Sequence, residues 1–272
     1  MSGQGLLALL ATVLSLGGGT AAGAEPAADG VVVGKPSAMR NLVPAGELEK
    51  AAYQQYSELK RAAAEKNALA ANDNPQLIRL RGIARNILPY ASRFNPSAQR
   101  WRWEVNLIAS KQLNAFCMPG GKIAFYTGII DTLKLSDDEI AIVMGHEIAH
   151  ALREHARERM AKSTLTNLGA AVLGEFIAGG RASGLFRAGG NLMTLKFSRD
   201  DESEADLIGL DLAARAGYDP RAGISLWRKM GEASKGAPPA WLSTHPAGQD
   251  RIMEIERQLP QVMPLYKAAR QN

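Results

Sequence analysis

Cysteine and histidine are scarce in this sequence. Cys117 is the only cysteine among 272 residues, so an internal disulfide framework is excluded and a thiolate-rich zinc site is not expected. We expect Cys117 to be a buried apolar side chain rather than a reactive thiol. Lys and Arg outnumber Asp and Glu by only 32 to 27, and the two signs are interleaved with no dense basic block. Binding to nucleic acid is therefore not expected.

Charge is also missing from the first 24 residues. An apolar run from Gly5 to Gly18, followed by Ala22-Gly23-Ala24, is the pattern of a secretory signal peptide with its cleavage site. An uncleaved membrane anchor is the alternative, but the run is shorter than the roughly 20 apolar residues of a span. We therefore expect residues 1–24 to be a signal peptide and residues 25–44, rich in Gly, Pro, Ala and Val, to be a linker or extended arm.

The rest of the chain predicts a mainly helical α+β fold with a small sheet. Alternating residues indicate a strand at 100–110 and a hairpin at 114–130, centred on Pro119-Gly120-Gly121. A Gly- and Ala-rich stretch at 164–195 is expected to be a mobile segment or a broken helix pair. The basic helix near residues 77–88 can touch a membrane surface, although such charges more often face water. Periodicity and caps predict helices at about 47–69, 77–88, 136–160, 199–216, 221–232 and 246–259.

Three of the four histidines lie in one stretch, MGHEIAHALREH, from Met144 to His155. His146 and His150 are four residues apart, so on a helix both imidazoles leave the same face one turn apart. At that spacing they can bind one Zn²⁺ at about 2.0–2.1 Å each. Glu147 points about 100° away from His146 and can act on a water molecule without being a ligand. His155 lies off that face, and we expect it to be a surface or capping histidine near the helix end.

The same string can occur by chance on an exposed helix. Here apolar residues such as Ile140, Val143 and Ile148 surround it, so the helix is expected to be buried. Buried histidines and a buried glutamate without partners are costly, which favours a metal site.

A third protein ligand is expected in DDESEAD, residues 200–206. Glu202 and Asp206 share one helix face with Ala205 and Gly209, and small residues on that face allow close approach of another helix. Glu204 is turned about 200° from Glu202. We therefore choose Glu202 as the ligand and Asp206 as the acceptor that orients a ligand histidine. A solvated acidic first turn is the alternative for this patch.

The three motifs HEIAH, SRDDESEAD and STHPAGQDRI together resemble the M48 family of zinc metallopeptidases over about Leu107 to Arg257. The resemblance is strongest to its bacterial periplasmic members, which together with the signal peptide implies a periplasmic location. It implies a zincin-like catalytic domain over residues 45–260 with a C-terminal tail at 261–272. The chain shows neither the multiple spans of the membrane members nor a helical-repeat domain before Asn272, so neither prenyl-protein processing nor recruitment by such a domain is expected.

The resemblance also implies roles for individual residues. It implies one zinc ion per chain held by His146, His150 and Glu202, with Glu147 as the catalytic base. His245 matches a family histidine near the metal, either a zinc ligand at rest or a group that stabilises the oxyanion, and Arg251 matches a motif arginine near the site. Finally, it implies that the strand region at Asn114, Ala115 and Phe116 pairs with an extended substrate.

Two functions follow from these expectations. The first is a zinc-dependent endopeptidase that cleaves unfolded or misfolded envelope polypeptides in protein quality control. The second is a latent or non-proteolytic, chaperone-like protein in which His245 closes a structural zinc site with four protein ligands.

Overall fold

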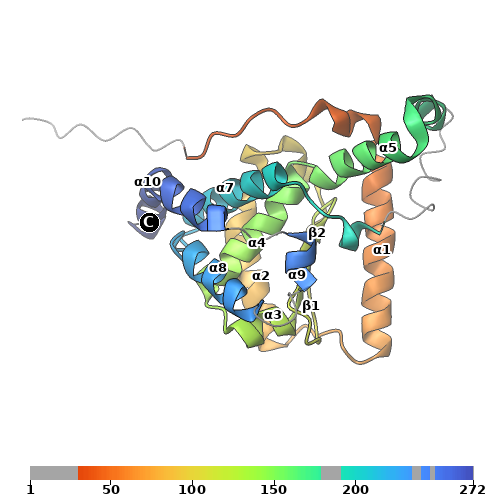
Figure 1. The fold of residues 1–272 in the computed structure, drawn as a ribbon. Coiled ribbons are helices and arrows are strands. Elements are labelled where there is room, and N and C mark those ends of the chain that lie inside the picture. Colours follow the sequence, from red (N-terminus) through yellow and green to blue (C-terminus); the bar gives the residue numbers. More distant parts are fainter. Residues whose placement is uncertain (1–29, 179–190, 235–239, 246–248, 272) are drawn as a thin grey trace, which may run out of the picture.

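The computed structural model describes residues 30–178, 191–234, 240–245 and 249–271 (Figure 1). Helices surround one small sheet, which confirms the predicted mainly helical α+β fold. The strands are β1 (Glu104–Ile108), β2 (Ala115–Met118) and β3 (Lys122–Tyr126). The helices are η1 (Ala38–Leu42), α1 (Ala45–Glu65), α2 (Pro75–Ile87), η2 (Leu88–Arg93), η3 (Pro96–Arg100), α3 (Thr127–Leu133), α4 (Asp137–Leu152), α5 (His155–Ala178), η4 (Leu192–Thr194), α7 (Arg199–Arg215), α8 (Ala222–Ala233), α9 (Ala240–Thr244) and α10 (Gln249–Gln271).

The sheet has the strand order β1-β3-β2, with β1 parallel and β2 antiparallel to β3. Side chains of β3 alternate between its two faces, as the pleat requires. Ile123 and Phe125 join the main core with α4, whereas Ala124 joins a smaller cluster under α1. The sheet is therefore covered by α1 on one face and by the helical core on the other (Figure 1). Strand β2 is left at the edge, where it contacts α4.

The predicted hairpin turn is confirmed at Pro119-Gly120-Gly121. Both glycines have positive φ, and a Cβ on Gly121 would lie 2.6 Å from the Trp103 ring, so this position requires glycine. The predicted strands were too long at two ends. Residues before Trp101 form η3, capped by Asn95, and residues after Tyr126 enter α3. Cys117 is half-buried and packs against the core.

Helix α4 is the central helix of the fold, with neighbours α2, α7, α8 and β2. Its side chains are buried from Glu139 to Leu152, as expected for a helix that is apolar on almost every face. A capping box begins the helix: Ser136 Oγ accepts from the Glu139 amide, and Glu139 Oε2 accepts from the Ser136 amide. A rigid, buried helix therefore carries the histidine motif.

The prediction of one continuous helix over 136–160 is wrong. Helix α4 ends at Leu152, Glu154 adopts a left-handed conformation with φ of 59°, and α5 begins at His155. That conformation costs a residue with a Cβ about 1–2 kcal/mol. An ion pair of 2.8 Å from Arg157 to Glu154 helps to hold it. The break changes the direction of the chain immediately before the third histidine.

Helix α5 continues to Ala178, and residues 179–190 of the stretch predicted to be mobile or a broken helix pair lie outside the described residues. One further prediction about helices is wrong. Helix α10 does not stop before Pro260 but runs through Pro260 and Pro264 to Gln271. Each proline costs about 3 kcal/mol inside a helix. The burial of Val262 and Leu265 against the core, worth roughly 1.5–3 kcal/mol each, offsets much of that cost.

The predicted signal peptide at 1–24 and the predicted helix start near 246 also lie outside the described residues. Among the helices that the structure describes, none combines the length and the apolar character that a membrane span requires.

Candidate metal centre

Helix α4 presents His146 and His150 on one face, as their spacing predicts. Their Nε2 atoms lie 3.1 Å apart, and both side chains are 2–3% exposed. Glu147, also buried, lies beside them on the same turn. Trp241 Nε1 donates to Glu147 Oε1 at 2.6 Å, so the orientation of this carboxylate is fixed by an indole from α9.

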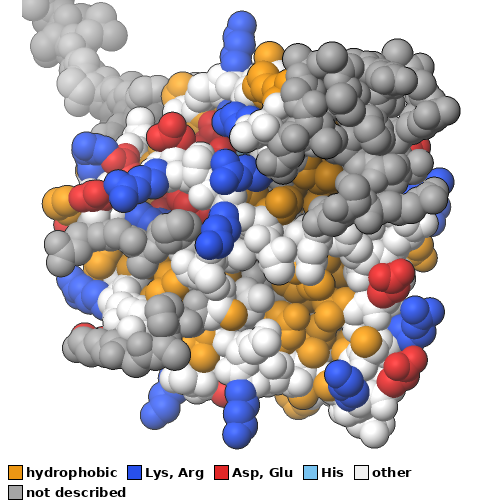
Figure 2. Space-filling view, turned by 45° about the vertical axis from the view of Figure 1, so that its right-hand side comes forward, with side chains coloured by type: hydrophobic (Ala, Val, Ile, Leu, Met, Phe, Trp, Pro, Cys, Tyr) orange, Lys and Arg blue, Asp and Glu red, His pale blue; other side chains and the backbone are white. Residues whose placement is uncertain are grey.

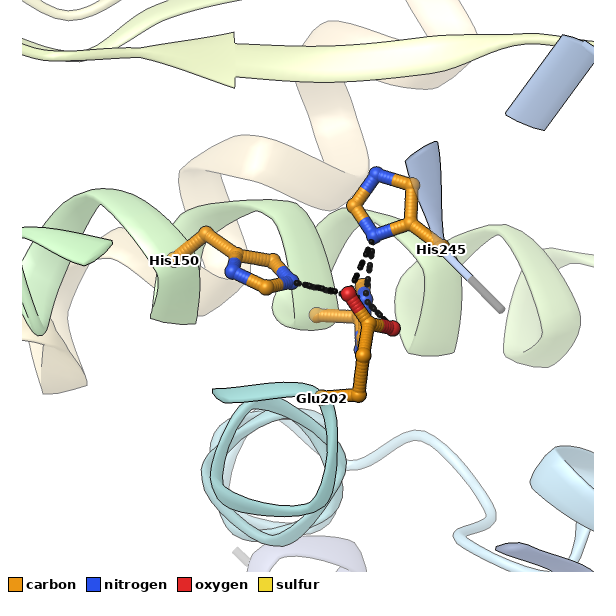
Figure 3. A group of neighbouring side chains, drawn as sticks. His150, Glu202 and His245 are labelled. Carbon is orange, nitrogen blue, oxygen red and sulfur yellow. Dashed lines mark hydrogen bonds and ion pairs between the residues drawn. The ribbon is translucent and has the colours of Figure 1, made fainter. Parts of the chain in front are cut away.

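Helix α7 crosses α4 and brings Glu202 to the two histidines. Glu202 Oε2 lies 3.5 Å from His146 Nε2, and Glu202 Oε1 lies 3.4 Å from His150 Nε2. Figure 3 shows His150 and His245 both turned toward the Glu202 carboxylate, which projects from α7. Glu204, in contrast, pairs with Arg153, as its rotation away from Glu202 predicts.

His245, directly after α9, supplies a fourth donor. Its Nδ1 lies 2.9 Å from Glu202 Oε1 and 3.2 Å from His146 Nε2. One donor atom each from His146, His150, Glu202 and His245 lies within 4.8 Å of the others. All four side chains are buried.

The spacing and the charge of this cluster fit a zinc ion. Tetrahedral zinc with bonds of about 2.0–2.2 Å sets its ligands roughly 3.4 Å apart. The pairs of donor atoms above lie 2.9–3.5 Å apart. Three buried carboxylates and one buried guanidinium line the site, so neutral histidines leave two negative charges, which a divalent cation balances. The charged residues are Glu147, Glu202, Asp206 and Arg251.

The carboxylates favour a positive charge at His146. Burial lowers the pKa of His146, but the hydrogen bonds and charges of Asp206 and Glu202 outweigh it and raise the pKa to about 9. A bound divalent cation supplies that positive charge in place of the proton. Burial lowers the pKa of His150 well below its usual range, so this imidazole is neutral, as a metal ligand must be.

Asp206 and Arg251 form hydrogen bonds that hold the donor residues His146 and Glu202 in place. Asp206 Oδ1 lies 3.0 Å from His146 Nδ1, which assigns the proton of a neutral His146 to Nδ1 and leaves Nε2 for a metal. Arg251 donates to both oxygens of Asp206 at 2.6 Å and to Glu202 Oε2 at 2.7 Å. It also stacks 3.8 Å over the Trp227 ring. Both residues lie where the sequence predicts them.

A narrow pocket leads from the edge strand to the cluster. Asn114, Ala115 and Phe116 line it together with Glu147, His150 and His245. Its other walls include apolar residues of α1 and of the segment before α7, and hydrophobic side chains gather on the α1 side of the molecule (Figure 2). The three residues predicted to contact substrate therefore lie at the site.

Three residues at the site were missed or misplaced by the sequence analysis. His155 is buried and contacts His150, so the prediction of a surface or capping histidine near the helix end is wrong, because the helix breaks before it. Phe197 stacks on the His150 ring at 4.0 Å. Its position directly before the N-cap Ser198 is a signal, since apolar residues there commonly pack back on the helix. Trp241 is four residues before His245, a spacing that places both on one side of a helical turn.

The close crossing of α4 and α7 depends on two glycines. A Cβ on Gly209 would lie 2.8 Å from the His146 amide nitrogen, and a Cβ on Gly145 would lie 2.7 Å from the Gly209 carbonyl oxygen. The predicted small-residue face is therefore confirmed, and it sets how near Glu202 comes to the histidines.

We expect Gly209→Ala to destabilise the protein by about 1–3 kcal/mol, because the backbones must move apart. Chemical denaturation measures this free energy of unfolding. The control is Gly82→Ala in α2, where an added Cβ meets no atom within 4 Å. We expect that variant to be as stable as the original or up to about 1 kcal/mol more stable, since alanine favours helix. Equal effects of the two substitutions would show that the crossing is not tightly packed.

Histidines one turn apart on a buried helix, a glutamate beside them and a carboxylate from a second helix define a zincin-like metal site. A comparison with known families agrees: the family described as "Peptidase family M48" matches residues 79–259, more than half of the chain. The chain belongs to peptidase family M48.

Individual relatives agree with that assignment. The chain is 41% identical over 152 residues to the mitochondrial metalloendopeptidase OMA1 of Arabidopsis thaliana, covering 55% of this chain and 30% of that protein. It is 38% identical over 166 residues to that of Schizosaccharomyces pombe (59% and 48%). It is 28% identical over 191 residues to the beta-barrel assembly-enhancing protease of Yersinia pestis (65% and 39%). The chain thus spans less than half the length of these curated relatives.

These relatives overturn the predicted periplasmic location. The proteins matched at 41% and 38% identity are mitochondrial, whereas the bacterial protease matches at 28%. The prediction relied on residues 1–24 and on a likeness to periplasmic members, and the likeness to the mitochondrial proteins is greater.

Proposed function

We propose that this chain is a zinc-dependent endopeptidase that hydrolyses peptide bonds in unfolded polypeptides. The observation that carries the proposal is the position of Glu147. Its carboxylate is buried beside the donor cluster and held by Trp241 at 2.6 Å, where it can serve as a base. The names of the relatives, metalloendopeptidase and protease, support the same reaction.

His146, His150 and Glu202 would hold the zinc ion. When bound, zinc supplies Lewis acidity that polarises the scissile carbonyl and makes water easier to deprotonate. Glu147 takes the proton of the attacking water and later delivers a proton to the leaving amine. The Trp241 indole holds Glu147 during both transfers, while Asp206 and Arg251 keep His146 and Glu202 in place.

The polypeptide would bind along β2. This strand is at the edge of the sheet, and its residues 115–118 line the pocket together with the preceding Asn114, Glu147 and His245. An extended peptide can add to such an edge through backbone hydrogen bonds, which carry little side-chain selectivity. That mode of binding suits unfolded chains as substrates.

His245 would be the fourth zinc ligand of a resting state and would have to leave for substrate to bind. Support comes from its Nδ1 atom, which lies within hydrogen-bonding distance of Glu202 and His146. The same geometry also favours a second function, a non-proteolytic protein with a closed structural zinc site.

His245→Ala separates these functions. We expect the variant to keep its zinc through three remaining ligands and to cleave casein faster than the original protein, because an open position is created. The measurements are zinc content and casein cleavage for both proteins. If neither protein cleaves casein and the variant loses its zinc, the closed structural site is favoured. If the variant keeps zinc but loses a cleavage activity that the original protein has, His245 acts in the reaction and is not merely the fourth zinc ligand of a resting state.

A further inference from the structure

His155 and Glu204 form a chain of hydrogen bonds that ends at a metal-binding histidine. His155 Nδ1 lies 2.9 Å from His150 Nδ1, and His155 Nε2 lies 3.0 Å from Glu204 Oε2. His155 is 3% exposed, so these two groups, together with the Asp201 carboxylate 3.8 Å from Nε2, face it in place of solvent. Neither His155 nor Glu204 belongs to the donor cluster itself.

The Glu204 end of this chain of hydrogen bonds determines which atoms are donors and which are acceptors. Arg153 donates to both oxygens of Glu204 at 2.7 Å. These two hydrogen bonds from a guanidinium favour the ionised form of the Glu204 carboxylate. An ionised carboxylate only accepts hydrogen bonds, so His155 Nε2 must be the donor.

The proton on His155 Nε2 determines where the protons of the other ring nitrogen atoms lie. A neutral His155 that carries its proton on Nε2 has a lone pair on Nδ1. Two nitrogen atoms 2.9 Å apart share one proton, so His150 donates from Nδ1 to His155. The lone pair of His150 is then on Nε2, the atom that lies 3.4 Å from Glu202.

The geometry points to His155 as a positioning residue that fixes the metal-binding tautomer of His150 by relaying the charge of Glu204. His146 obtains the same tautomer directly from the Asp206 carboxylate at 3.0 Å. The two ligand histidines are thus oriented by two carboxylates, one in contact and one through an intervening imidazole. The inference rests on the proposed function only in that a zinc ion occupies the donor cluster.

The break between α4 and α5 makes this contact possible. On a continuous helix, His155 would be turned about 140° from His150, since five residues rotate by about 500°. The left-handed Glu154 turns the chain back so that the first residue of α5 reaches the last turn of α4. The unusual conformation of Glu154 therefore has a consequence at the metal site.

Two substitutions test the two nitrogen atoms of His155 separately. In His155→Asn, the amide oxygen takes the place of Nδ1 and can still accept from His150. In His155→Gln, the amide reaches toward Glu204 in the place of Nε2 but offers no acceptor to His150. We expect the Gln variant to bind Zn²⁺ about 10–100-fold more weakly than the original chain, and the Asn variant to bind it within a few-fold. The measurement is a competition titration of Zn²⁺ against a chelator with the full chain.

A second measurement needs no substitution. With four histidines in the sequence, ¹⁵N-labelled imidazoles can be assigned, and the zinc-loaded protein should show His155 protonated on Nε2 with an unprotonated Nδ1. A proton on His155 Nδ1, or equal zinc affinity in the Gln variant and the original chain, overturns the inference. Neither readout depends on cleavage. If the protein cleaves no substrate but gives both expected results, the proposed function is refuted and this inference is supported.

Discussion

Glu147→Gln is expected to lower the rate of casein cleavage by about 10²- to 10⁴-fold while the protein keeps its zinc. Glutamine has nearly the same shape and can still accept the hydrogen bond from Trp241, so the packing around α4 is preserved. It cannot take a proton from water at neutral pH. The buried carboxylate of Asp206 cannot replace it, because both oxygens of Asp206 accept from Arg251 and one of them contacts His146.

The measurements are the cleavage rate and the zinc content of the same preparation. The control is Glu158→Gln on α5, the same chemical change at a side chain that pairs with Lys162. We expect this control to cleave casein at the original rate. Retained cleavage in Glu147→Gln would refute Glu147 as the base, whereas loss of zinc would mean that Glu147 helps to bind the metal.

The zinc ligands could be predicted from the sequence because the information is local. Spacings of four residues place His146 with His150 and Glu202 with Asp206, and the caps at Ser136 and Ser198 fix where both helices begin. The small residue Gly209 indicates which face of the second helix approaches the first. Each of these signals lies within a few residues along the chain, where helix geometry converts spacing into direction.

The position of His155 could not be predicted in this way. The residues around 153–155 include no glycine or proline, so nothing in their propensities stops the helix. The break is imposed by tertiary contacts: Arg153 is drawn to Glu204 on α7 and to the Gly34 carbonyl, and Glu154 to Arg40. The same kind of override carries α10 through two prolines, because its far end is buried against the core.

The second large effect is expected for His150→Ala. Loss of an outer partner of a zinc ligand costs about 10–100-fold in affinity, so loss of the ligand itself should exceed about 100-fold. The substitution also leaves the Phe197 ring and the acceptor on His155 without their partner. An unsatisfied buried acceptor costs about 1–3 kcal/mol, so the metal-free variant should be less stable than the metal-free original protein.

Thermal unfolding with and without zinc separates these two effects. At a free zinc concentration 1,000 times its Kd, the original protein should gain about 4 kcal/mol of stability, because zinc binds the folded state. The variant should gain far less stability at the same zinc concentration. A chelator should remove whatever stabilisation by zinc remains. A variant that keeps full zinc occupancy and the full gain in stability would show that His150 is not a ligand. The zinc would then have to be held by His146, Glu202 and His245, which are the three donors of the cluster that remain without His150.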